Sequence, residues 1–149
     1  MTTLIFGVRS PGALLALPFL LPSTAYAADI SLSLANLPDE GTVVLQVYDD
    51  ANAFGNFRGP AREERYAIRP GQAYTISDAP EGEIAVLVYL DENDNQALDR
   101  NFIGIPREPV GLSNNYQPKG PPSFQRAAFN AQRGSAIHLD IELFNVLGE

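Results

Sequence analysis

The sequence has no cysteine and no tryptophan, and it has only one histidine and 10 basic residues against 18 acidic ones. The lack of cysteine excludes disulfides, thiolate metal sites and cysteine catalysis, so the stability of the fold depends on packing alone. The formal net charge of −8 predicts repulsion from nucleic acid and from anionic lipid. We therefore expect neither of these partners.

Familiar catalytic motifs are also missing. No serine lies in a G-x-S-x-G elbow, and His138 falls on the polar side of an alternating stretch, where a solvent-exposed position is expected. The acidic residues offer many carboxylate pairs, but a small sandwich rarely encloses the deep cleft that would select one pair for catalysis. The sequence therefore predicts no catalytic residues and a protein that is not an enzyme.

The longest apolar run lies near the N-terminus. Arg9 precedes an apolar segment at residues 13–21, and an A-Y-A motif ends at Ala27, an order typical of a secretory signal cleaved after Ala27. The run is shorter than the roughly 20 residues that a membrane-spanning helix needs. We expect residues 1–27 to be a signal peptide, with no membrane insertion after its removal. A single domain of residues 28–149 would then be periplasmic or extracellular.

The rest of the chain shows the alternation of apolar and polar residues that predicts strands. Seven strands are expected, at residues 30–34, 42–48, 65–69, 73–77, 83–90, 127–130 and 135–144. Residues 83–90 are continuously apolar, as a strand covered on both faces would be. We expect residues 127–130 to pair with the C-terminal strand, and a helical turn near residues 61–65. The pattern predicts an all-β fold, an immunoglobulin-like or transthyretin-like antiparallel sandwich of about seven strands.

A long segment rich in proline and glycine, at about residues 101–126, separates the fifth and sixth of these strands. Structureless loops of this length are uncommon in compact domains, so we expect an ordered flap packed on a sheet face or an open end. Phe102, Tyr116 and Phe124 are candidates for a surface that recognises an unknown protein or saccharide. The alternative is that these aromatic side chains seal the end of the sandwich.

Residues 90–99, LDENDNQALD, place oxygen-bearing side chains directly after the most apolar strand. The alternate positions 91, 93, 95, 97 and 99 match the spacing at which a curled loop binds calcium. The predicted metal ligands are Asp91, Asn93, Asn95, the carbonyl of Ala97, and Asp99, completed by Asp49 if the two strand ends meet. Because the twelfth position is Phe102 and not glutamate, a helix-loop-helix calcium site is excluded. The alternative is a solvated turn held by its own Asp and Asn side chains.

Three stretches, YLDENDNQALDRNFIGIP, GLSNN and GPPSFQRAAF, resemble the domain-of-unknown-function family numbered 2141, which consists of small secreted bacterial proteins. The resemblance implies export and a sandwich fold, and it brings no reaction. That family tends to have glycines inside the acidic loop, where this chain has Asp94 and Gln96.

These observations together predict an exported, non-catalytic accessory or binding module of unknown ligand. The alternative is a structural domain stabilised by calcium at residues 91–99, and calcium is the one cofactor that the sequence suggests.

Overall fold

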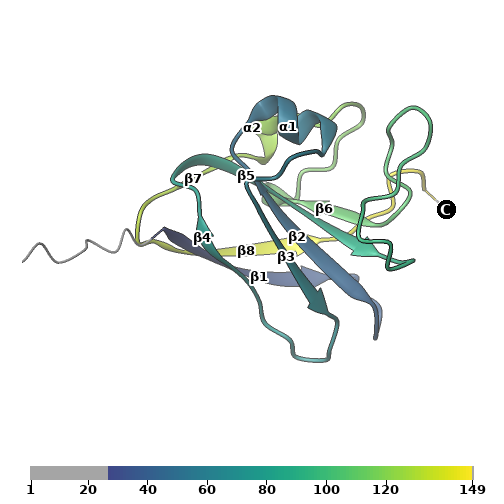
Figure 1. Cartoon of the computed structure of the whole chain (residues 1–149), viewed down its shortest axis with the longest axis horizontal. Coiled ribbons are helices and arrows are strands. Elements are labelled where there is room, and N and C mark those ends of the chain that lie inside the picture. Colours follow the sequence, from purple (N-terminus) through teal and green to yellow (C-terminus); the bar gives the residue numbers. More distant parts are fainter. Residues whose placement is uncertain (1–26, 149) are drawn as a thin grey trace, which may run out of the picture.

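A computed structural model of the protein describes residues 27–148, and the predicted signal peptide lies almost entirely outside them. Its strands form two sheets that pack face to face (Figure 1). The three-stranded sheet has the order β4 (Tyr74–Ala79), β1 (Ala28–Ala35), β8 (Ala136–Glu142). The five-stranded sheet has the order β3 (Arg62–Ala67), β2 (Thr42–Tyr48), β5 (Gly82–Asp91), β6 (Val110–Leu112), with β7 (Phe129–Ala131) also paired to β5.

The predicted all-β sandwich is confirmed, and its pairing differs from expectation in two places. The strand at Phe129–Ala131 was expected to pair with the C-terminal strand, but it pairs with the start of β5, where Gly82 lies opposite Ala131. A turn closed by the Ser135 N–H and the Gln132 carbonyl then leads the chain into the other sheet. There β8 runs parallel to β1, so the sandwich is antiparallel except for this one pair.

The inner core lies between the two sheets and follows the period of two in the sequence. Val43, Leu45 and Val47 of β2 point inward, as predicted, and meet apolar side chains of β1, β4 and β8. On β5, Val86 and Val88 belong to this inner core. The intervening residues of β5 face the opposite side, and they are buried too. The continuous apolar run of β5 therefore reflects cover on both faces, as expected.

Two short helices lie on the outer side of the five-stranded sheet (Figure 1). The helix α1 (Ala51–Asn56) starts after Asp50, whose carboxylate accepts a hydrogen bond from the Ala53 N–H at 2.8 Å and caps the helix. The second helix is α2 (Phe124–Ala127). The helical turn expected near residues 61–65 is wrong, because this segment enters β3 and pairs with β2.

The segment 101–126 packs on the outer face of the five-stranded sheet. It contributes β6 and the short 3₁₀ helix η1 (Ser113–Asn115), and its apolar side chains join Val44, Tyr48 and Leu87 in a second hydrophobic cluster. The structure thus has a third layer, made of the two helices and this flap.

The flap is attached closely to both sheets. A Cβ added at Gly111 would lie 2.5 Å from Cγ2 of Ile141 on β8, so only glycine allows β6 to approach β8 this closely. Val110 also forms an isolated antiparallel bridge with Phe144, just after β8. Among the described residues, no helix is long and apolar enough to cross a membrane.

Candidate functional site

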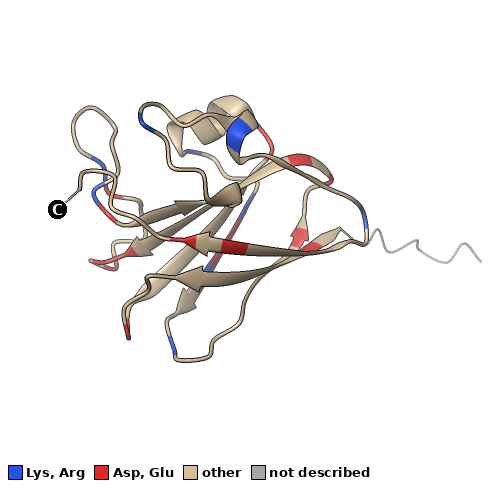
Figure 2. Ribbon diagram, turned by 180° about the vertical axis from the view of Figure 1, so that it is seen from behind, with Lys and Arg blue, Asp and Glu red and all other residues tan. Residues whose placement is uncertain are grey.

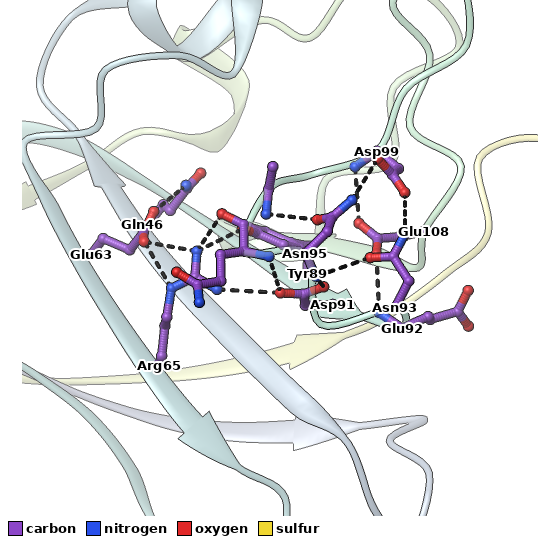
Figure 3. Close-up of polar contacts among 12 residues, drawn as sticks. Gln46, Glu63, Arg65, Tyr89, Asp91, Glu92, Asn93, Asn95, Asp99 and Glu108 are labelled. Carbon is purple, nitrogen blue, oxygen red and sulfur yellow. Dashed lines mark hydrogen bonds and ion pairs between the residues drawn. The ribbon is translucent and has the colours of Figure 1, made fainter.

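The acidic loop, residues 91–99, is folded around the buried carboxylate of Asp91 (Figure 3). The two oxygens of Asp91 accept hydrogen bonds from the backbone N–H groups of Asn95 at 3.1 Å and Gln96 at 2.9 Å. Arg65 on β3 donates to the same carboxylate at 3.3 Å and to the Gln96 carbonyl at 2.7 Å. The buried carboxylate of Asp91 therefore holds the loop in place, and both of its oxygens already accept hydrogen bonds from the protein.

Three of the predicted metal ligands come together at the other side of the loop. The side-chain amides of Asn93 and Asn95 donate to the two oxygens of Asp99, at 2.6 and 3.0 Å. The side-chain oxygens of both asparagines accept backbone N–H groups, those of Asn95 at 3.2 Å and Ala97 at 2.9 Å. This is the pattern of Asx turns, in which short polar side chains stabilise a bend.

Glu108 from the flap holds both ends of the acidic loop. Its carboxylate is almost completely buried and accepts from the Glu92 N–H and the Asp99 N–H, each at 3.0 Å (Figure 3). Burial raises the pKa of Glu108 above its ordinary value, although the two backbone hydrogen bonds oppose that rise. The sequence pattern did not single out Glu108 or Arg65, because each is distant from the loop in the chain.

Asp49 does not join the loop, so that part of the metal prediction is wrong. Strands β2 and β5 are antiparallel, with Thr42 opposite Asp91 and Tyr48 opposite Ala85. Six residues of strand separate these two positions, which corresponds to roughly 20 Å. Asp49 therefore lies at the opposite end of the sheet. Among the residues that the structure describes, no group of three or more histidine and acidic side chains is arranged to hold a metal ion.

The three aromatic residues of the predicted recognition surface serve different purposes. Phe124 packs edge to face against Phe54 of α1, with ring centroids 5.9 Å apart. Tyr116 is half buried beneath the Arg126 guanidinium, which lies 5.6 Å from the ring centroid. Only Phe102 is presented to solvent, with 98% of its surface exposed. The expected single surface made of all three side chains does not form.

Phe102 stands on a well-ordered loop, residues 100–106, which we call the flap hairpin. The side-chain oxygen of Asn101 accepts hydrogen bonds from the N–H groups of Ile103 at 3.1 Å and Ile105 at 2.9 Å. The backbones of Arg100 and Pro106 form an isolated antiparallel β-bridge. These bonds fix the backbone while leaving Phe102 and Ile103 exposed, Ile103 by 64%. Apolar side chains held in water by a rigid loop are typical of a binding surface.

Beside the flap hairpin lies an open cleft of about 620 Å³, which we call the outer cleft. Its floor is apolar and includes Val110 and Leu112 of β6 and Val146 near the C-terminus. The walls are the flap hairpin, the C-terminal end of α1, and the loop 118–122. This volume falls within the range of about 300–1,000 Å³ that small-molecule sites occupy.

The charge of the outer cleft is opposite to that of the whole chain. Arg100 and Lys119 line it, Arg58 lines a shallower hollow beside it, and among the described residues neither hollow is lined by Asp or Glu. None of these three cations forms an ion pair with a described residue. Figure 2 shows Lys and Arg on the loops near the helices, and Asp and Glu at the rim where β5 ends as well as on other strands and turns.

The sequence interpretation missed the outer cleft, although a signal for it was present. Gly104, Ile105 and Pro106 belong to one of the stretches that carry the family resemblance, and residues 120–122 belong to another. The structure brings both stretches to the walls of the same cleft.

His138 lies on the open face of the three-stranded sheet, away from both hollows. It contacts Ser31 at 2.9 Å, Ser33 at 3.1 Å and Asp140 at 3.3 Å, so an acidic partner is within reach of the imidazole. The side chains of His138 and Asp140 are 56% and 79% exposed. On such a surface water screens their interaction, which limits what the pair can contribute.

The fold and the two candidate sites define a small β-sandwich domain with a ligand-sized cleft on its outer layer. A comparison with protein families matches residues 36–138 to the family described as "Uncharacterized protein conserved in bacteria (DUF2141)". The match spans more than half of the chain, and the protein belongs to this family. Searches of curated proteins and of solved structures gave no match.

Proposed function

We propose that the protein is an exported, non-catalytic binding module and that the outer cleft is its ligand site. The observation that carries the proposal is the cleft itself, which is of ligand size, has an apolar floor and carries cations without ion-pair partners. Rigid walls favour binding, because little conformational entropy is lost when a ligand enters. Four prolines supply much of this rigidity: Pro106, Pro118, Pro121 and Pro122.

The residue types in the cleft support binding without catalysis. Among the described residues, no Ser, Cys, His, Asp or Glu lines it, so the usual nucleophiles and proton-transfer groups are missing from its walls. The one amine that the described residues place in the lining is that of Lys119, which is exposed to water, whereas a nucleophilic amine is typically desolvated in an apolar pocket.

The cleft assignment can be tested by filling the cleft from one side. Gly55 lines it from α1, and a Cβ at this position would meet only the Pro122 carbonyl oxygen, at 4.0 Å, across the opening. Gly55→Leu should therefore obstruct the cleft without strain, whereas Gly55→Ala should leave it open. Both changes favour the helical conformation.

The measurement is two-dimensional NMR with neutral ring compounds such as indole, phenol and cyclohexanol. In the wild type and in Gly55→Ala, the shifts should concentrate on Val110, Leu112 and Val146, and in Gly55→Leu they should disappear. Shifts scattered over the surface, or unchanged in Gly55→Leu, would contradict the assignment of the cleft.

Export is supported by the order of charge, apolar run and A-Y-A motif in the first 27 residues. Expression of the full chain in a Gram-negative host should give a periplasmic or extracellular product whose first residue is Ala28. A full-length product retained in the cytosol would contradict this part of the proposal.

The second candidate function is a structural domain stabilised by calcium at the acidic loop. The alternate spacing of oxygen-bearing side chains at residues 91, 93, 95 and 99 supports it, because calcium loops use such spacing. The ion would have to displace the hydrogen bonds by which the Asn93 and Asn95 amide nitrogens hold Asp99. Millimolar calcium should then raise the melting temperature, and Asp99→Ala should abolish the increase. The matched control is Asp49→Ala, which changes an acidic residue far from the loop and should keep the increase. Identical melting curves in calcium and in chelator would exclude this function.

A further inference from the structure

We infer that the outer cleft binds a small anionic amphiphile, a molecule with an apolar chain and one carboxylate, such as a medium-chain fatty acid. The inference rests on the proposed function and adds the chemical class of the ligand. Two features of the cleft lead to it, the sign of its charge and the proline and aliphatic residues in its walls.

The first feature is charge complementarity. The chain carries 18 acidic residues, yet among the described residues the lining of the outer cleft includes none of them and includes Arg100 and Lys119. The Arg100 side chain donates one hydrogen bond to the Asn56 carbonyl, which orients it at the cleft, while its charge is left without a carboxylate partner. A carboxylate placed between the two cations would receive charge-assisted hydrogen bonds.

The second feature is the chemistry of the walls. Proline has no backbone N–H, and the four prolines therefore remove donors from the positions that a sugar or an extended peptide would use. Five further lining side chains are aliphatic, those of Ile103, Ile105, Val110, Leu112 and Val146. The hydroxyl groups of a saccharide would lose their bonds to water and gain few replacements. An alkyl chain has no such cost, so an apolar body suits these walls.

The size of the cleft agrees with a small ligand. A volume of about 620 Å³ accommodates a single chain or ring system, whereas standard protein interfaces bury about 800 Å² on each partner. Ile103 forms part of both the outer cleft and the adjacent hollow, and its exposed side chain could cover an alkyl chain that extends beyond the floor.

The test compares decanoate, decan-1-ol and decyltrimethylammonium, which share one chain length and differ in the charge of the head group. Isothermal titration at low salt, below the aggregation limit of each probe, should show that decanoate binds at least tenfold more tightly than decyltrimethylammonium. Raising sodium chloride from 20 to 300 mM should weaken the binding of decanoate and leave the binding of decan-1-ol unchanged, because salt screens charge. This measurement needs no variant.

Variants locate the head group. Arg100→Gln and Lys119→Gln should each lower the affinity for decanoate by about tenfold, the usual effect of losing one charge-assisted hydrogen bond. Gly55→Leu should abolish binding. The matched control is Arg69→Gln, which removes an exposed arginine that forms no ion pair with described residues and does not line the cleft. It should leave the affinity unchanged.

Several outcomes would overturn the inference. Equal affinity for decanoate and decan-1-ol would show that the anionic head group does not contribute to binding. If none of the three decyl probes binds, the ligand is not an amphiphile of this kind. In both cases the cleft remains a ligand site if the neutral ring compounds still shift its residues. Binding to phosphatidylglycerol vesicles without binding to monomeric decanoate would assign the surface to membrane docking. Self-association that Gly55→Leu prevents would assign it to a second copy of the chain.

Discussion

The acidic loop and the outer cleft differ in how their polar groups are used. At the acidic loop the oxygens of Asp91, and those of Glu108 from the flap, accept backbone N–H groups, and those of Asp99 accept side-chain amides. In the outer cleft Arg100 and Lys119 have no carboxylate partner among the described residues, and Phe102 and Ile103 on its bordering hairpin face water.

This difference indicates which region supports the fold and which is available to a ligand. A polar group whose hydrogen bonds are complete contributes to stability, and losing its partner leaves a buried donor or acceptor unsatisfied. A cation without a partner contributes little to stability and retains its capacity for a ligand. Substitutions in the two regions should therefore differ in their effect on the free energy of unfolding, with large losses in the loop and small ones in the cleft.

The largest effect is expected for Asp91→Ala. The change removes the acceptor for two backbone N–H groups and for Arg65, and we expect it to lower the free energy of unfolding by about 3 kcal/mol. Urea denaturation followed by circular dichroism measures this change. Glu92→Ala is the matched control in the same loop, since the Glu92 side chain is exposed, and it should change stability by less than about 0.5 kcal/mol. Equal effects of the two substitutions would contradict the structural role of Asp91.

Local patterns in the sequence were enough to predict much of the sandwich. The alternation in β2 and the continuous apolar run of β5 identified which residues face the core, because a strand presents successive side chains to opposite faces. The pairing of β7 with β5 could not be predicted in this way. It depends on which distant strand edge is free, and that information is not contained in the local pattern.

The candidate sites show the same division. The spacing of Asp91, Asn93, Asn95 and Asp99 is local, so the sequence alone was enough to draw attention to this loop, and calcium binding there stays a prediction. Asp49 was assigned to it wrongly because the relative direction of β2 and β5 is a property of the sheet. The cleft has walls from three separate segments without periodicity, so no single stretch revealed it.

The next largest effect is expected for Glu108→Gln. Glutamine keeps the shape of the side chain but has only one oxygen, so either the Glu92 N–H or the Asp99 N–H would face an NH₂ group. We expect a loss of about 2 kcal/mol in the free energy of unfolding, the typical cost of an unsatisfied buried group. Glu83→Gln is the control, because Glu83 is exposed on β5, and it should have almost no effect. A neutral outcome for Glu108→Gln would show that the flap does not hold the loop.

The free energy of unfolding of the wild type and of Glu108→Gln should depend differently on pH. Because burial raises the pKa of Glu108 in the folded state, the folded protein takes up a proton at a higher pH than the unfolded chain does. The stabilisation that comes from this proton uptake is therefore fully present below the ordinary pKa of a glutamate. It is lost as the pH rises through the raised pKa of the folded state. The stability difference between the wild type and Glu108→Gln should grow as the pH falls from 7 toward 4.5. A difference that narrows would mean that the two backbone hydrogen bonds outweigh burial.

A smaller effect, opposite in sign, is expected for Gln96→Gly. Gln96 has a φ of 66°, in the left-handed region that glycine adopts without strain. We expect the substitution to raise the free energy of unfolding by about 0.5–1 kcal/mol. Gln117→Gly is the control, since Gln117 is exposed and has no positive φ, and the added flexibility there should lower stability slightly. Loss of stability in Gln96→Gly would indicate that the glutamine side chain has a role in the loop beyond its backbone conformation.

The smallest effect on stability is expected for Lys119→Gln. Lys119 lies on an exposed loop and forms no ion pair with described residues, so its loss should change the free energy of unfolding by less than about 0.5 kcal/mol. The same substitution should weaken decanoate binding, and the two measurements together separate a ligand-binding cation from a structural one. If Lys119→Gln destabilised the protein as much as Asp91→Ala does, the cation would be part of the scaffold, and the distinction between the acidic loop and the outer cleft would be lost.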